Sequence, residues 1–343
     1  MITHLFMFYY LCTEPFMKNS LIVLFLSCSI VFAGDNISFK GISFSASNKV
    51  TVVGDIQPIA NLNANWISIV PYGFLKNNEV RYDSKYQWVG EKPEAIRECV
   101  QLAKSQGLKV MIKPHIWIGE GTYTGLYQCQ NEDEWKMLEE SYRNYLMAFV
   151  NIAQDEGVEM FCIGTEWGKF VELRPKYWKG LIKDIRKVYQ GKLIYAANWD
   201  DYQKVKFWTD LDYIGIDSYF PLSLEPNPKL VQLIRSWKTI MPILEQYSSL
   251  QKKKIVFTEF GFKSTTHATI SPWEHKDEGE FSEKVQDLAF KSFFQTIWKK
   301  PWFKGGFIWK WYHDHKHAGG RGDTDFTPQN KLAEQTIKKF YTD

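Results

Sequence analysis

The chain has few cysteines, almost no net charge and only one long apolar run. Cys12 and Cys28 fall within residues 1–33, and the remaining three of the five cysteines are an odd number, which is not the paired set of a disulfide-stabilised scaffold. The net charge of +3, from 42 basic and 39 acidic residues, gives no field that would hold a polyanion, so nucleic acid is not expected as a partner. Beyond residue 33, no stretch approaches the ~20 apolar residues of a membrane span.

The chain also lacks a glycine-rich phosphate loop, a long internal repeat and a linker. Because no such loop follows the first expected strand, a doubly wound nucleotide-binding sheet is disfavoured. A barrel of alternating strands and helices runs to about 250 residues as one domain, and to more with insertions. We therefore expect residues 34–343 to form one domain.

Residues 1–33 have the features of a leader. A basic start at Lys18 precedes the apolar run from Leu21 to Phe32, and Ala33 supplies a small residue at a cleavage site before Gly34. This pattern predicts a secretory signal peptide and a secreted or periplasmic protein.

Two details of the leader leave alternatives open. Residues 1–16 precede the signal and are interpreted as an upstream extension from a misassigned start codon. The tripeptide Leu26-Ser27-Cys28 alternatively matches a lipoprotein signal, which would place a lipid on Cys28 and anchor the protein at the cell envelope. Its apolar segment would be only about half the usual length, which favours the signal peptide.

Apolar runs that alternate with amphipathic stretches predict the fold. This alternation continues from residue 39 to the end and is typical of strand–helix units around a parallel sheet, so the fold class is α/β, a single (β/α)8 TIM barrel. The eight expected strands are Phe39–Ser45, Trp66–Tyr72, Lys109–Ile116, Glu159–Thr165, Lys192–Asn198, Tyr213–Ser218, Ile255–Thr258 and Gly306–Trp309. The clear helices are Pro93–Gln106, Asp133–Asp155, Tyr177–Gln190, Lys229–Leu250, Phe281–Lys299 and Gln329–Tyr341, with a poorly periodic one in 50–64.

Two of these strands run into a glutamate. Glu166 follows the fourth strand, and Glu259 follows the seventh. Active sites of such barrels lie at the carboxyl ends of the strands, so both side chains are expected to face one site. Hydrolysis of a glycosidic bond needs one carboxyl to protonate the leaving oxygen and another to attack or to activate water, and this pair meets that need. One such glutamate alone would equally suit a helix cap or a salt bridge.

The other strand exits carry side chains that suit a sugar site. Aromatic residues make up 16% of the chain, and although most must pack in the core, aromatic faces also pack on the apolar faces of pyranose rings. Tyr219 is a candidate donor to Glu259, although packing beneath the following loop is an equal alternative. Trp309 and Trp311 are two residues apart and should point to the same side, so at least one is expected to form a stacking platform. The full set of expected substrate-binding residues is His115, Trp117, Trp167, Asn198, Trp199, Asp217, Tyr219, Trp309 and Trp311.

The chain offers no convincing metal site. His313, His315 and His317 have an alternate spacing, but no matching ligand cluster occurs elsewhere and the segment is rich in glycine. Exposed polar positions explain these histidines better. We expect neither a metal nor a cofactor.

At the level of motifs, the chain resembles glycoside hydrolase family 113, whose characterised members are mainly β-mannanases. The matching segments are IGTEW, YAANWD, IGIDSYFP, FTEFGF, GFIWKWY and DTDFTPQNK, and the resemblance covers roughly residues 38–340. It implies that Glu166 is the general acid/base and Glu259 the nucleophile. Thr165 stands where most of the wider clan places an asparagine that binds the sugar 2-hydroxyl, and Asn198 is our candidate for that contact, with a turn role as its alternative.

The prediction is therefore a retaining β-glycoside hydrolase that resembles an endo-β-1,4-mannanase and acts on a β-linked oligo- or polysaccharide. Two alternatives stay open: a clan relative that cleaves another β-linked glycan, and a carbohydrate-binding barrel without turnover.

Overall fold

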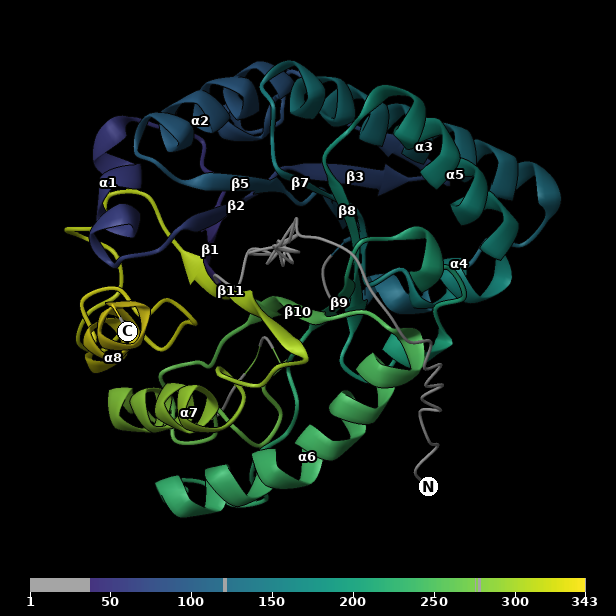
Figure 1. The fold of residues 1–343 in the computed structure, drawn as a ribbon. Helices are drawn as coiled ribbons and strands as arrows, with labels where there is room; N and C mark the ends of the chain where they lie inside the picture. The colour runs from purple at the N-terminus through teal and green to yellow at the C-terminus, as the bar shows by residue number, and fades with distance from the viewer. Residues whose placement is uncertain (1–37, 120–121, 275, 277–278, 343) are drawn as a thin grey trace, which may run out of the picture. The chain divides into compact units, whose positions relative to one another are not determined.

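The computed structural model describes residues 38–119, 122–274, 276 and 279–342, and within them a closed parallel barrel forms the centre of the fold (Figure 1). Its strands close in the order β1-β11-β10-β9-β8-β7-β5-β2. Their bounds are β1 Phe39–Ser45, β2 Trp66–Val70, β5 Lys109–Ile112, β7 Met160–Thr165, β8 Lys192–Asn198, β9 Ile214–Asp217, β10 Ile255–Phe260 and β11 Phe303–Trp311. The predicted (β/α)8 barrel is confirmed.

Helices surround the barrel (Figure 1). They are α1 Val53–Asn61, α2 Pro93–Ser105, α3 Glu132–Asp155, α4 Gly168–Leu173, α5 Pro175–Val188, α6 Leu230–Gln251, α7 Glu283–Thr296 and α8 Leu332–Thr342. Two of them, α4 and α5, connect β7 to β8. Residues 199–213, between β8 and β9, are all described and contain only the short 3-10 turns Tyr202–Lys204 and Trp208–Asp210.

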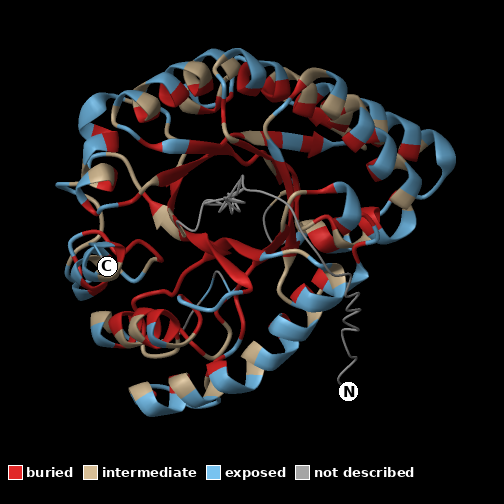
Figure 2. Ribbon diagram, viewed as in Figure 1, coloured by how far each residue is buried: buried red, intermediate tan, exposed pale blue. Residues whose placement is uncertain are grey.

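Local sequence explains where the helices begin. Pro93 occupies the first turn of α2, where its missing N–H costs no hydrogen bond. The side chain of Asn131 accepts a hydrogen bond from the N–H of Glu134 and caps α3, and Ser282 caps α7 through the N–H of Val285. Each long helix buries one face against the strands and exposes the other, as Figure 2 shows.

The barrel interior is packed with side chains. One cluster of buried apolar residues comes entirely from barrel strands and fills the interior, as expected for a barrel of this size. Its members are Phe39, Trp66, Met111, Met160, Cys162, Ile194, Ala196, Val256 and Phe307. Cys162 is fully buried in this cluster, and its thiol is free, like those of Cys99 and Cys129.

A second, three-stranded sheet was not predicted. It has the order β4-β3-β6 and consists of β3 Tyr72–Lys76, β4 Glu79–Arg81 and β6 His115–Trp117. The expected strands Trp66–Tyr72 and Lys109–Ile116 were therefore too long. Pro71 and Pro114 lie at the two breaks. Because proline has no N–H to donate, both segments leave the barrel at these positions. Tyr72 and His115 then pair with each other in the small sheet.

The leader predicted at residues 1–33 lies outside the described residues. In the part of the chain that is described, no helix combines the length and apolar character needed to cross a bilayer.

Candidate active site

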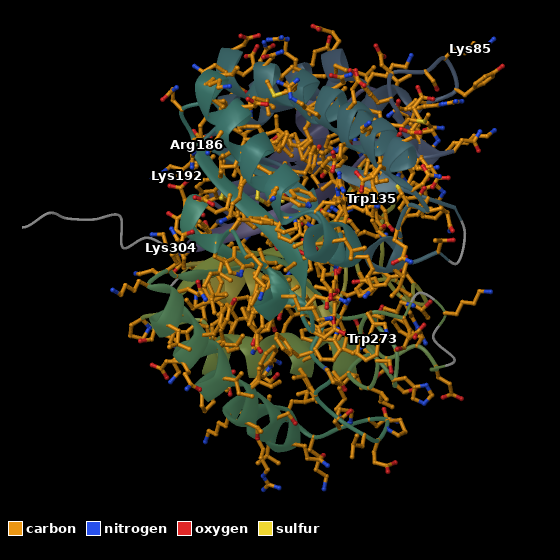
Figure 3. All side chains as sticks on the ribbon, turned by 90° about the vertical axis from the view of Figure 1, so that its right-hand side faces the viewer. Lys85, Trp135, Arg186, Lys192, Trp273 and Lys304 are labelled. Atoms are coloured by element: carbon orange, nitrogen blue, oxygen red, sulfur yellow. The ribbon has the colours of Figure 1, made fainter. Side chains whose placement is uncertain are left out.

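The two glutamates lie at the carboxyl ends of β7 and β10. Figure 3 shows the two ends of the barrel from the side: Lys192 and Lys304, near the starts of β8 and β11, lie at one end, and Trp273, after β10, lies towards the other. Glu259 is the fifth residue of β10, and Glu166 comes directly after β7. Both glutamates therefore belong to the end of the barrel at which active sites form.

Glu166 is held in an uncommon backbone conformation. Its φ is +53°, in the left-handed region that residues other than glycine, asparagine and aspartate rarely adopt. Its N–H donates to the carbonyl of Ala196 at 2.8 Å, and the N–H of Trp167 donates to the hydroxyl of Tyr195 at 2.9 Å. These bonds from β8 hold the turn in place. Strain retained in this way is found at functional sites, where it aims a side chain.

Burial and charge both raise the pKa of Glu166. Burial has the largest effect, and the negative charges of Asp217 and Glu259 add to it, so the pKa lies well above its usual value. The side chain of the next residue, Trp167, is fully buried. At neutral pH, Glu166 can therefore hold a proton.

Glu259 has the opposite ionisation. Its carboxylate accepts a hydrogen bond from the Tyr219 hydroxyl at 2.7 Å, contacts the Lys113 ammonium, and lies 3.2 Å from Nε2 of His115. Burial alone would raise its pKa, but the charge of Lys113 and the contact with His115 outweigh burial and lower the pKa to about 2. Of the two roles considered for Tyr219, the structure shows the hydrogen bond to Glu259.

Asp217 is not placed to bind a sugar directly. It was predicted to contact substrate, but it is fully buried. Both of its carboxylate oxygens already have protein partners: Lys113 lies 3.1 Å from Oδ2, and the Thr258 hydroxyl donates to Oδ1 at 2.7 Å. Burial and the charge of Glu259 raise the pKa of Asp217 to about 7. Asp217 and Glu259 are also register partners on β9 and β10, so the two carboxyls are adjacent.

His115 lies between the nucleophile candidate and an indole. Its ring stacks on Trp309, with centroids 5.6 Å apart and planes within 7°. Burial and the charge of Lys113 lower the pKa of His115 to about 4, which keeps the imidazole neutral at pH 7. Trp309 is partly exposed. The carbonyl of Trp309 approaches Gly261 so closely that a Cβ there would lie 2.1 Å from it, which explains the glycine two residues after Glu259.

Besides Asp217, two further predicted sugar contacts are wrong in this structure. The indoles of Trp167 and Trp311 are both fully buried in the main core. Trp167 packs edge-on against Tyr142 and Phe170. For Trp311 the assumption of regular alternation fails: Ile42 pairs with Ile308 but Phe44 pairs with Trp311, so β11 carries an extra residue. Such a bulge sends Trp309 and Trp311 to different surroundings.

The remaining predicted residues lie near the same end. Asn198 accepts a hydrogen bond on Oδ1 from the N–H of Trp199 at 2.9 Å, which is the turn role considered as its alternative. Trp199 stacks on Trp273, with ring centroids 5.2 Å apart, and Trp117 is 46% exposed. The Thr165 hydroxyl donates to the carbonyl of Pro114 at 3.3 Å.

Sequence reasoning missed three residues of this site. Lys113 stands within the apolar run VMIKPHI, and a lysine surrounded by apolar strand residues is a signal for a buried ion pair. Tyr123 follows β6, and burial, followed by the negative charge of Glu166, raises its pKa. Trp273 lies in a long loop after β10 and has no comparable signal.

Each of the three clustered histidines has its own partner. His313 lies 3.1 Å from the Thr51 hydroxyl, His315 lies 2.9 Å from Glu334, and His317 contacts Asp314. Among the residues that the structure describes, no group of three or more histidine, cysteine or acidic side chains is arranged to hold a metal ion.

Comparisons with known proteins give the family and agree with the fold. The family model of Glycoside Hydrolase Family 113 matches residues 46–331. A GH113 β-1,4-mannanase complex superposes with a TM-score of 0.78 at 24% identity, covering 89% of this chain and 99% of that one. A GH113 β-mannanase from Alicyclobacillus acidocaldarius, in complex with ManMIm, gives 0.77 at 22% identity, covering 90% and 98%.

A more distant structural likeness is the β-glucuronidase of Faecalibacterium prausnitzii, with a TM-score of 0.61 at 17% identity over 89% of this chain and 49% of that one. No curated protein matches the chain in sequence.

Proposed function

The chain belongs to Glycoside Hydrolase Family 113 and is a glycosidase, and from this premise we propose that it hydrolyses β-glycosides with retention, using Glu259 as nucleophile and Glu166 as acid/base. The observation that supports these roles most strongly is the opposite ionisation of the two carboxyls. The pKa of Glu259 is lowered to about 2, whereas burial raises that of Glu166 well above its usual value. A nucleophile must be ionised and a general acid protonated, so each environment suits one role.

In the first step, an oxygen of Glu259 bonds to the anomeric carbon while the glycosidic C–O bond breaks. The electron pair of that bond goes to the leaving oxygen, which takes the proton of Glu166. Tyr219 orients the attacking carboxylate through its 2.7 Å hydrogen bond. The neutral His115, stacked on Trp309, is a further neighbour of this carboxylate, beside Tyr219 and Lys113.

In the second step, Glu166 is a carboxylate and removes a proton from an incoming water. The water oxygen bonds to the anomeric carbon, the ester bond to Glu259 breaks, and its electron pair restores the carboxylate. Two inversions at the same carbon give net retention.

The proposed substrate is a β-1,4-linked mannan or manno-oligosaccharide, cleaved within the chain. Two of the most similar solved structures carry the β-mannanase name and are covered almost completely by the match. The stacked indoles of Trp199 and Trp273 and the exposed Trp117 offer flat apolar surfaces of the kind that pack on pyranose rings.

A substrate panel tests the function. Purified protein is incubated with mannan, glucan, xylan and galactan, and products are separated by size. Release of manno-oligosaccharides of several lengths from mannan alone is expected. Activity only on another polymer would overturn the mannan assignment, and binding without products from any polymer would support a non-catalytic barrel.

We also propose that the protein is secreted or periplasmic through its leader. Sequencing the mature N-terminus is the test: a start at Gly34 supports signal-peptide cleavage, whereas a lipid-modified start at Cys28 supports the envelope anchor.

A further inference from the structure

Lys113 is a fully buried lysine that contacts two carboxyls at once. It follows directly after β5, and its ammonium contacts Glu259 and lies 3.1 Å from Asp217. A buried lysine is costly unless paired, and its position between two acids from two other strands is therefore a built arrangement. Asp217 is in turn fixed by the hydroxyl of Thr258 at 2.7 Å.

We propose that Lys113 and Asp217 form a positioning pair for the nucleophile, in which Lys113 holds Glu259 ionised in the free enzyme and Asp217 keeps Lys113 paired once Glu259 is esterified. This inference rests on the proposed role of Glu259. It assigns neither residue a contact with substrate.

The charge balance of the reaction supports the pair. In the free enzyme, the Lys113 ammonium faces two carboxyls that compete for its charge. Glu259 is the more strongly stabilised carboxylate, because Tyr219 donates a hydrogen bond to it as well. Any additional proton therefore binds to Asp217, whose pKa is raised to about 7 by burial and by Glu259. When Glu259 becomes a neutral ester, that competition ends and Asp217 takes over the buried ammonium. Without Asp217, formation of the ester would leave an uncompensated charge in the core.

Other groups also face this pair, and their ionisation bears on any pH effect. The titratable groups on the elements around the pair are His115, Tyr72, Cys162, Tyr219 and Glu166. The charges of Asp217 and Glu259 outweigh burial and raise the pKa of Lys113 above its usual value, so Lys113 stays charged throughout the working pH range.

The test is the pH dependence of kcat/KM for Lys113→Met, Asp217→Asn and the double variant, with any substrate that the wild-type protein hydrolyses. In Lys113→Met, two carboxyls without a counter-charge share a proton, so the acid limb should move up by about 1–3 pH units. The double variant removes the competing carboxyl as well, and its limb should return towards that of the wild type. Asp217→Asn should lower kcat more than it raises KM, because the loss appears when the ester forms.

A matched control is Lys331→Met. Lys331 is equally buried but pairs with Asp323 at 2.8 Å and contacts Ser264, so its loss should leave the acid limb in place even where stability falls. Folding of each variant is checked by circular dichroism and thermal unfolding.

The outcomes separate this inference from the proposed function. If the wild-type protein hydrolyses no glycan, the proposed function fails. If it is active but Lys113→Met keeps the wild-type limb, or the double variant shifts as far as the single one, the positioning pair is wrong. If Lys113→Met does not fold, the double variant decides, because it buries one carboxyl without a counter-charge where the single variant buries two. Failure of both to fold would show that the pair stabilises the barrel, and would overturn the proposal.

Discussion

Replacing Trp309 should mainly lower activity, whereas replacing Trp311 should mainly lower stability, although both residues belong to β11. Trp309 is partly exposed and stacks on His115, whereas Trp311 is fully buried in the core. Trp309→Ala removes the stack, worth about 0.5–1.5 kcal/mol, and the proposed contact with the sugar, worth on the order of 1 kcal/mol. The combined loss corresponds to a fall of about 10–70-fold in kcat/KM.

Trp311→Ala instead leaves a cavity in the core. Removing a fully buried tryptophan costs about 3–5 kcal/mol of unfolding free energy, so Tm should fall by several degrees while kcat/KM of the folded fraction changes little. Trp311→Phe is the conservative control and should recover much of this stability.

Steady-state kinetics and thermal unfolding of these variants are measured side by side. The reasoning fails if Trp309→Ala keeps the wild-type kcat/KM, or if Trp311→Ala loses activity at an unchanged Tm.

Two further predictions concern the glutamates. Tyr219→Phe removes a hydrogen bond to a charged group, worth about 1.5–3 kcal/mol, or about 1–2 pKa units. Since the pKa of Glu259 is low in the folded protein, losing a donor raises it, and the acid limb of kcat/KM should move up; an unmoved limb would contradict the role of Tyr219. Glu166→Ala should lose activity on natural glycans but retain it on dinitrophenyl glycosides, whose leaving group needs no proton. Its profile should also lack the basic limb, which in the wild type comes from deprotonation of Glu166 at its raised pKa; equal losses on both substrates would argue against an acid/base role.

The barrel could be predicted because its strands are short apolar runs with clear helices between them. The bounds of β1 and β8 were predicted to the residue, and both glutamates were placed at strand exits. The predicted strands beginning at Trp66 and Lys109 were too long, because they continued across Pro71 and Pro114. At these two prolines the polypeptide leaves the barrel for a second sheet. Apolar character is the same in both sheets, so periodicity alone does not show the exchange.

The site was harder to predict than the fold because contacts depend on register. A single extra residue in β11 placed Trp311 in the core, and spacing along the chain carries no sign of it. Asp217 was recognised as a strand-exit residue, but its burial depends on Lys113, which lies 104 positions away. Pairings between distant strands of this kind become visible only when the barrel closes.

The most direct test of the proposed mechanism is azide rescue of Glu259→Ala with an activated aryl glycoside. Without a carboxylate at this position no glycosyl ester can form, so the variant should be inactive on every substrate, and azide should enter the vacated space and restore turnover. The product should be a glycosyl azide of inverted configuration, identified by NMR. Substantial hydrolysis by Glu259→Ala without azide, or an azide product of retained configuration, would contradict the assignment of Glu259 as the nucleophile.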